Sequence, residues 1–251
     1  MNMCQIGVIT GDMRIIAHRG WSGKYPENTM LAFNEAIGVG ADGIELDVHL
    51  SKDNEVMIIH DESLLRTAGV DALVSELTRS ELERISAGKT MNDVHGFTPI
   101  PSLEEYLDRV SKTSIITNIE LKTAPCHYPG IERRVLELVK RFSYEDRVIF
   151  SSFNWLSVME MKRQAKELPC ALLIEGISIK NIAEQISSLG FEYYHPSFSI
   201  LSDEDVNSCK EHGVGLNVWT VNKEDEMAKC KKWGIDGMIT NHVDAALSFK
   251  G

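Results

Sequence analysis

The chain contains few cysteines, and none of them forms a recognisable pair. Cys4, Cys126, Cys170, Cys209 and Cys230 are an odd number and lie far apart, with no C-x-x-C spacing. This pattern argues against a disulfide framework and against a cysteine-rich zinc or redox site. We therefore expect reduced thiols that pack in the core or lie at the surface.

Long hydrophobic runs are also missing. No stretch approaches the roughly 20 apolar residues that a membrane span requires, and residues 1–13 lack the basic start and apolar segment of a secretory signal. No amphipathic or basic stretch suggests docking to a lipid surface. We expect a cytoplasmic protein with no stable membrane association, composed of a short leader at 1–13 and a single domain at 14–251.

Positive charge is scarce. The sequence has 26 Lys and Arg against 37 Asp and Glu, which gives a formal net charge of −11. A nucleic-acid partner, whose phosphate backbone requires a basic face, is therefore not expected. An anionic small molecule would need cations gathered locally at its binding site.

Short apolar segments alternate with amphipathic stretches along the chain. Alternation of this kind indicates parallel strands joined by helical crossovers, and eight such units predict closure into a TIM (β/α)8 barrel, which typically needs about 250 residues. The expected strands are 14–17, 43–50, 115–122, 147–152, 170–174, 193–195, 215–219 and 237–240.

One region, about 61–101, is too long for a simple crossover. It follows the second strand region and contains a capping box, Thr78-x-x-Glu81, which opens a short helix expected to end at Gly88. We interpret the region as a small subdomain inserted above the barrel. Insertions on that face border the active site, so the segment is either a packing element or one wall of the site.

Polar and charged side chains gather in the first quarter of the chain, at or near the ends of apolar runs. Glu45 and Asp47 are two residues apart, so on a strand they point to the same side and can hold one hard cation between them. The complete set is His18-Arg19-Gly20, Pro26-Glu27-Asn28-Thr29, Glu45-Leu46-Asp47 and His60-Asp61.

A turn centred on Asp53-Asn54 predicts a hairpin in this region. A tight turn would pair Ser51 with Val56 and, counting back, Asp47 with His60. Residues that face each other across two strands share one side of the sheet. His60 is therefore expected beside the Glu45 and Asp47 carboxylates.

A second polar row lies on the strand expected at 115–122. Asn118, Glu120 and Lys122 share one face, while Ile119 and Leu121 occupy the other. Such a row at the end of a strand is unusual for a core. The alternative is a buried ion pair between Glu120 and Lys122 without a catalytic role.

These motifs, in this order, resemble the glycerophosphodiester phosphodiesterases from about residue 14 to the C-terminus. The resemblance rests on the segments His-Arg-Gly, Pro-Glu-Asn-Thr, Glu-x-Asp and His-Asp, followed by Glu-Leu-Lys at 120–122. It implies an enzyme of lipid and glycerol metabolism that cleaves deacylated phospholipids, such as glycerophosphocholine, to glycerol 3-phosphate and an alcohol. It also implies the TIM barrel fold.

The resemblance adds Glu120 to Glu45 and Asp47 as the third metal ligand. A set made only of carboxylates points to Mg²⁺ or Ca²⁺. Arg19 and Lys122 would contact the phosphate, and Arg19 offers a bidentate fork that suits phosphate oxygens. The cofactor expected is therefore a divalent metal ion, and the partner a small glycerophosphodiester.

The resemblance further implies that His18 and His60 exchange protons with the substrate, since imidazole titrates near neutral pH. By analogy His18 is the base and His60 the acid, although the residues alone do not decide between them. Phe153 and Trp219 form either a wall of the glycerol pocket or plain core. Glu27, just after His18, either orients that imidazole or binds the metal.

Three other functions compete with this interpretation. A barrel hydrolase acting on C–N bonds usually has several histidine ligands, but His18 is followed by Arg rather than by x-His. A noncatalytic binding barrel would be expected to lose one of the key imidazoles or carboxylates. The third alternative is a lipid-cleaving phosphodiesterase of the same fold. The sequence does not determine the preferred head group, the physiological metal or the oligomeric state.

Overall fold

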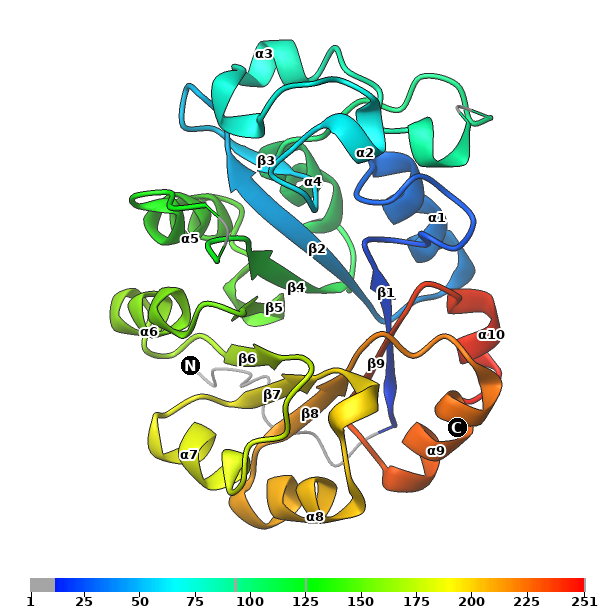
Figure 1. Cartoon of the computed structure of the whole chain (residues 1–251), viewed down its shortest axis with the longest axis vertical. Helices are drawn as coiled ribbons and strands as arrows, with labels where there is room; N and C mark the ends of the chain where they lie inside the picture. The colour runs from blue at the N-terminus through cyan, green and yellow to red at the C-terminus, as the bar shows by residue number, and fades with distance from the viewer. Residues whose placement is uncertain (1–11, 93, 125, 251) are drawn as a thin grey trace.

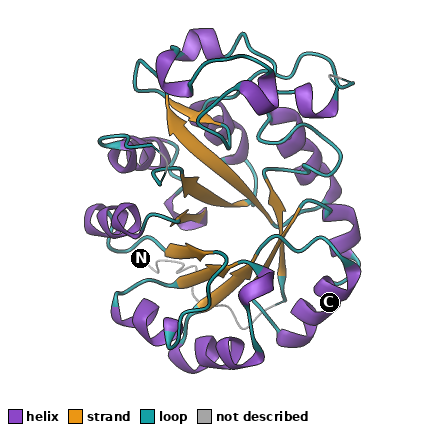
Figure 2. Cartoon of the chain, viewed as in Figure 1, coloured by secondary structure: helices purple, strands orange, loops and turns teal. Residues whose placement is uncertain are grey.

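The computed structural model describes residues 12–92, 94–124 and 126–250, in which eight parallel strands close into a barrel. Figure 1 shows the strands at the centre and the helices around them, and Figure 2 separates the two kinds of element. The first and last strands pair with each other, and pairing of the first with the second completes the ring, which confirms the TIM barrel. The barrel strands are β1 (Arg14–His18), β2 (Gly43–Leu50), β4 (Ile116–Leu121), β5 (Val148–Ser152), β6 (Cys170–Ile174), β7 (Tyr193–Pro196), β8 (Gly215–Val218) and β9 (Gly237–Thr240).

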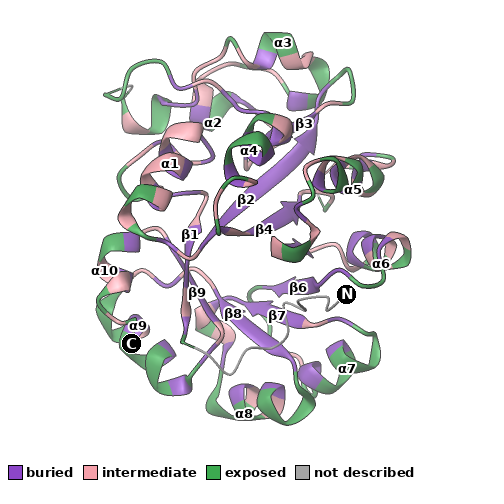
Figure 3. Cartoon of the chain, turned by 180° about the vertical axis from the view of Figure 1, so that it is seen from behind, coloured by how far each residue is buried: buried purple, intermediate pink, exposed green. Residues whose placement is uncertain are grey.

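Helices cover the outside of this barrel, so its strands are buried on both faces. All eight residues of β2 are buried, and Figure 3 shows the buried strands inside a ring of helices whose outer faces are exposed. α4 was not expected from the sequence; it is short and begins after the Ser102 cap. The surrounding helices are α1 (Met30–Val39), α4 (Leu103–Val110), α5 (Ile131–Arg141), α6 (Trp155–Gln164), α7 (Ile182–Ser188), α8 (Asp203–His212), α9 (Glu224–Trp233) and α10 (Val243–Leu247), with 3-10 turns η3 (Glu145–Arg147) and η4 (Phe198–Ile200).

Local capping fixes where the first barrel helix starts and stops. The Thr29 hydroxyl accepts a hydrogen bond from the Ala32 amide at the N-terminus of α1, which satisfies one of the free amides there. Gly40 ends the helix in the left-handed region at φ 98°, a conformation that glycine adopts without steric cost. The loop between β1 and α1, which carries Glu27, therefore ends at a defined residue, the Thr29 cap.

The hairpin that follows β2 has a different register from the expected one. β3 (Val56–Ile58) runs antiparallel to β2, with Leu50 opposite Val56, and the Ile59 amide bonds the Asp47 carbonyl. The Ser51 amide bonds the Glu55 carbonyl, so the loop is 52–54, three residues rather than two, with Asn54 in a left-handed conformation at φ 59°. The prediction that Asp47 pairs with His60 is therefore wrong by one residue.

The segment after β3 packs beside the end of β2 (Figure 1). It contains α2 (Leu65–Ala68), α3 (Arg79–Leu82) and the 3-10 turns η1 (Val74–Glu76) and η2 (Lys89–Met91). The capping box between Thr78 and Glu81 is confirmed, but α3 ends at Leu82 rather than at Gly88. The segment and β3 together form a small hydrophobic cluster, made up of Met57, Ile59, Leu64, Val74, Leu82, Ala87 and Ile100.

The expected leader lies outside the described residues except for Asp12 and Met13. No helix in the described part of the chain combines the length and the hydropathy needed to cross a membrane.

Candidate active site

Three carboxylates converge at one end of the barrel. Glu45 and Asp47 lie on β2, and Glu120 lies opposite Asp47 on the neighbouring β4. One oxygen from each carboxylate falls within 4.8 Å of the other two, and all three residues are buried. The pairing of β2 with β4 thus builds the predicted metal site from the carboxyl ends of two strands.

The charge balance of this triad fits a divalent cation. Burial and repulsion from Asp47 raise the pKa of Glu45 well above its usual range and that of Glu120 to about 7. Burial alone would also raise the pKa of Asp47, but Arg19 and Lys122 lower it. Asp47 Oδ1 is buried and accepts no hydrogen bond from any described residue. A hard cation would satisfy that oxygen and relieve the repulsion, and oxygen ligands suit Mg²⁺ or Ca²⁺.

His18 ends β1 directly beside the triad. Its Nδ1 lies 2.6 Å from the Asn241 side-chain oxygen, which can only accept, so this nitrogen carries the proton. Its Nε2 lies 3.9 Å from Glu45 Oε2. Burial, followed by the nearby Arg19 charge, lowers the pKa of His18 to about 4. The ring is therefore neutral, with an unprotonated Nε2 beside the carboxylates.

Arg19 connects the triad to the loop before α1. Its backbone amide donates to Glu45 Oε2 at 3.0 Å, and its Nε lies 3.4 Å from Asp47 Oδ2. Its Nη1 donates to Glu27 at 3.0 Å. The structure therefore places Glu27 against Arg19, outside the triad that could hold a metal, and among the described residues the Glu27 carboxylate makes no hydrogen bond to His18.

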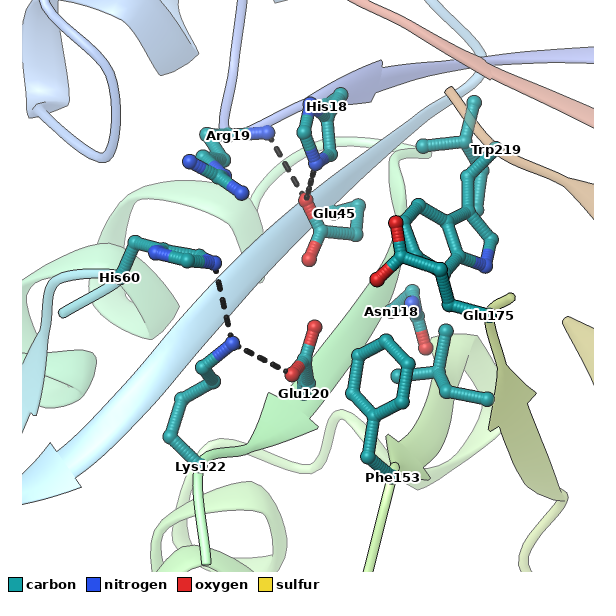
Figure 4. Close-up of a pocket in the computed structure, with 12 residues that line it drawn as sticks. His18, Arg19, Glu45, His60, Asn118, Glu120, Lys122, Phe153, Glu175 and Trp219 are labelled. Atoms are coloured by element: carbon teal, nitrogen blue, oxygen red, sulfur yellow. Dashed lines mark hydrogen bonds and ion pairs between the residues drawn. The ribbon is translucent and has the colours of Figure 1, made fainter. Parts of the chain in front are cut away.

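His60 is held from both sides of its ring. Its Nδ1 donates to the Asp61 carboxylate at 2.5 Å, and its Nε2 accepts from Lys122 Nζ at 3.1 Å. The His49 ring bonds the His60 carbonyl at 3.0 Å, so His49 supports the site through the backbone. Lys122 also lies 2.8 Å from Glu120, which places both predicted phosphate-binding cations next to the carboxylates (Figure 4).

Arg66, on α2, connects Glu27, the partner of Arg19, with Asp61, the partner of His60. Its guanidinium donates to both Glu27 oxygens at 2.8 Å and to Asp61 Oδ2 at 2.6 Å. Burial alone would raise the pKa of Asp61, but the bonds from Arg66 and His60 lower it to about 2. Sequence analysis missed Arg66 and Asn241, because neither belongs to a motif and each reaches the site only through the fold.

We expect Arg66→Ala to lower kcat about tenfold, because Asp61 loses the charged partner that fixes it against His60. The acid limb of the pH profile of kcat should also move to higher pH, since Asp61 then takes up a proton more readily. Arg84→Ala is the matched control, because Arg84 is exposed in the same inserted segment. An unchanged pH profile for Arg66→Ala would remove Arg66 from the positioning of His60.

A pocket of about 370 Å³ opens over these groups. The rings of Phe153 and Trp219 meet edge to face at 5.5 Å on one side of it, and the Trp219 indole nitrogen donates to the His195 carbonyl at 2.8 Å. Both aromatics are therefore pocket walls. Glu175, which the sequence did not single out, lies beside Trp219 (Figure 4). The pocket is lined by His18, Arg19, Glu45, His60, Asn118, Glu120, Lys122, Phe153, Leu173, Glu175, Trp219 and Ile239.

Comparison with known proteins gives a consistent result. The model of the glycerophosphoryl diester phosphodiesterase family matches residues 18–245. A glycerophosphodiester phosphodiesterase of Caldanaerobacter subterraneus is 37% identical over 93% of this chain and 96% of its own length. A phosphodiesterase of Oleispira antarctica, solved with the product sn-glycerol-3-phosphate, has 27% identity and a TM-score of 0.87 over 94% of this chain and 96% of that one. The glycerophosphodiester phosphodiesterase of Thermotoga maritima has 32% identity and a TM-score of 0.78, covering 96% and 99%.

Proposed function

The chain belongs to the glycerophosphoryl diester phosphodiesterase family, and we propose that it hydrolyses glycerophosphodiesters to glycerol 3-phosphate and an alcohol with a divalent metal and two catalytic histidines. The observation that carries this proposal is the placement of His18 and His60 in one pocket with the buried carboxylate triad of Glu45, Asp47 and Glu120. A noncatalytic binding barrel would have no need for two imidazoles held in this way.

A phosphodiester resists hydrolysis because its negative charge repels a nucleophile and because an alkoxide leaves poorly. The first difficulty requires positive charge at the phosphoryl oxygens. Arg19 and Lys122, which lie next to the two different oxygens of Asp47, supply part of it. A metal ion held by Glu45, Asp47 and Glu120 would supply the rest as a Lewis acid.

The second difficulty requires a base at one end of the reaction and an acid at the other. His18 suits the base, because it is neutral and Asn241 holds its proton on Nδ1, which leaves Nε2 free to accept one. His60 suits the acid once its Nε2, which accepts from Lys122 in this structure, has taken up a proton, because the Asp61 carboxylate bonded to its Nδ1 stabilises the charged ring. Burial lowers the pKa of both imidazoles, and attraction to Asp47 opposes this effect in both. The pKa of His60 stays below its usual value because Arg19 and Lys122 add to the effect of burial, but His60 has in addition the bond to Asp61, which raises it.

The attacking oxygen in this proposal is the glycerol hydroxyl on the carbon next to the phosphoester. It gives its proton to His18 and bonds to phosphorus, while the bond to the head-group oxygen breaks and that oxygen takes a proton from His60. Water then opens the five-membered cyclic phosphate with the two imidazoles in exchanged roles. Intramolecular attack gains a large effective-molarity advantage over attack by water.

One assay tests the proposed reaction. Purified protein is incubated with glycerophosphocholine, glycerophosphoethanolamine and a lysophospholipid, with and without chelator, and glycerol 3-phosphate release is measured. We expect release from the two water-soluble diesters only. Cleavage of the lysophospholipid instead would favour the lipid-cleaving alternative, and no release from any compound would favour a noncatalytic barrel. The cytoplasmic location stays a prediction from the sequence.

Loss of either catalytic imidazole should lower kcat by a large factor. His18→Ala and His60→Ala are expected to lower kcat by about 10²-fold or more, while thermal unfolding shows an intact fold. The double variant should lose much less than the product of the two single losses, because groups that act as a unit are not additive. A single variant with turnover near that of the wild type would exclude that histidine from the mechanism.

A further inference from the structure

A second pocket, of about 180 Å³, opens beside the catalytic pocket. From the shared residues the catalytic pocket extends toward His18 and Trp219, whereas the second pocket extends toward Glu62 and Ala124. A phosphoryl group held between the two pockets would therefore point one substituent into each. The residues that line both pockets are His60, Glu120, Lys122 and Phe153.

The positions of His18 and His60 indicate which substituent of the phosphoryl group enters which pocket. This step rests on the proposed function. His18 lines the catalytic pocket and is absent from the second one, whereas His60 lines both. The hydroxyl that gives up a proton must lie next to His18, so the glycerol part belongs in the catalytic pocket. The departing alcohol must lie next to His60, so the head group belongs in the second pocket.

The charges in the second pocket indicate what kind of head group it accepts. Asp61 is already bonded to His60 and Arg66, and Lys122 pairs with Glu120 and Asp47. Glu62 is half-buried, and although its backbone carbonyl accepts a hydrogen bond from the Val74 amide, its carboxylate makes no hydrogen bond or ion pair within the described ranges. One carboxylate of this pocket is thus left without a counter-ion, in a pocket that the aromatic ring of Phe153 also lines.

We propose that the second pocket binds the departing alcohol and that Glu62 selects a small cationic amino alcohol, of the ethanolamine or choline class. A carboxylate there attracts a positive group and repels an acidic one. The aromatic ring adds favourable contact with an alkylated ammonium group.

Glu175 is a matched control for this assignment. It too makes no hydrogen bond or ion pair with any other described residue, but it lies beside Trp219 in the catalytic pocket (Figure 4) and does not line the second pocket. It would therefore face the glycerol part, which is common to all substrates. Neutralising Glu175 should change turnover of every glycerophosphodiester by the same factor.

The experiment measures kcat/KM for glycerophosphoethanolamine, with a cationic head, and for glycerophosphoglycerol, with a neutral head. The wild type should prefer the cationic substrate. Glu62→Gln should lower the ratio of the two values about threefold to fivefold, as expected for a partly exposed ion pair, and Glu62→Lys should lower it further. Added salt should reduce the wild-type preference and have less effect on Glu62→Gln. Glu175→Gln should leave the ratio unchanged.

The outcomes separate this inference from the proposed function. If the wild type hydrolyses both substrates and Glu62→Gln keeps its ratio, the head-group assignment is overturned while the proposed function stands. If Glu175→Gln changes the ratio instead, the two pockets are exchanged and the inference is overturned. If the wild type hydrolyses neither substrate, the proposed function itself has failed. Thermal unfolding of each variant shows whether its fold is retained.

Discussion

A substrate analogue without the neighbouring hydroxyl should bind to the enzyme and not be cleaved. In 3-hydroxypropyl phosphocholine, hydrogen replaces the glycerol hydroxyl that would attack phosphorus, while the charge and the head group are kept. Intramolecular attack is worth an effective molarity of about 10⁵ M or more, so turnover should fall below detection. The compound should still inhibit competitively, with an inhibition constant near the KM of glycerophosphocholine.

The cyclic product of the first step provides the complementary test. Glycerol 1,2-cyclic phosphate, supplied as a substrate, should be opened to a glycerol phosphate by the wild type. His18→Ala and His60→Ala should both slow this opening, since the second step uses the same two groups. If the deoxy analogue is cleaved at a rate comparable to glycerophosphocholine, water attacks directly and the cyclic route is wrong.

Removal of divalent metal should abolish activity and lower stability together. Three buried carboxylates without a cation repel one another and an anionic substrate, as the raised pKa values of Glu45 and Glu120 indicate. Mg²⁺ or Ca²⁺ at 100 times its Kd should stabilise the fold by about 2.7 kcal/mol, which corresponds to roughly 5 to 10 °C in Tm for a chain of this size. Differential scanning calorimetry with and without chelator measures the shift independently of activity.

Variants of the triad separate metal binding from other effects. Glu45→Ala, Asp47→Ala and Glu120→Ala should each lose most of the Tm increase with metal, and isothermal titration should show weaker binding. Glu175→Gln, an acidic change in the same pocket but outside the triad, should keep both. Full activity after exhaustive chelation, or an unchanged Tm shift in the triad variants, would contradict the metal assignment.

The strands of the barrel were the most predictable part of the fold. The expected limits of the second strand, 43–50, coincide with β2 (Gly43–Leu50), because its apolar residues alternate with polar ones in the period-two pattern of a strand. α4 has clear helical spacing, with Leu103, Tyr106, Leu107 and Val110 buried on one face, but it follows directly on the irregular region 61–101 and was not recognised as a separate element. The hairpin register was wrong because the left-handed conformation of Asn54, which lengthens the turn, is not encoded by spacing.

The candidate site was predictable only as far as its motifs extend. Glu45 and Asp47 were placed together by strand alternation alone, and the meeting with Glu120 follows from the pairing of β2 with β4. Arg66 and Asn241 lie outside every motif, so their contacts with Glu27 and His18 follow from tertiary packing. A role for Glu62 and Glu175 could be assigned only from the pockets that they line in the folded chain.

The contact between His18 and Asn241 spans 223 positions of the sequence. Pairing of the first strand with the last brings these residues together, so His18 acquires the partner of its Nδ1 only when the ring of strands is complete. A nascent chain that ends before Asn241 contains every motif residue of the first quarter but lacks the side chain that bonds Nδ1 of His18. The return of activity during refolding should therefore coincide with closure of the barrel. A partly synthesised chain should have no activity.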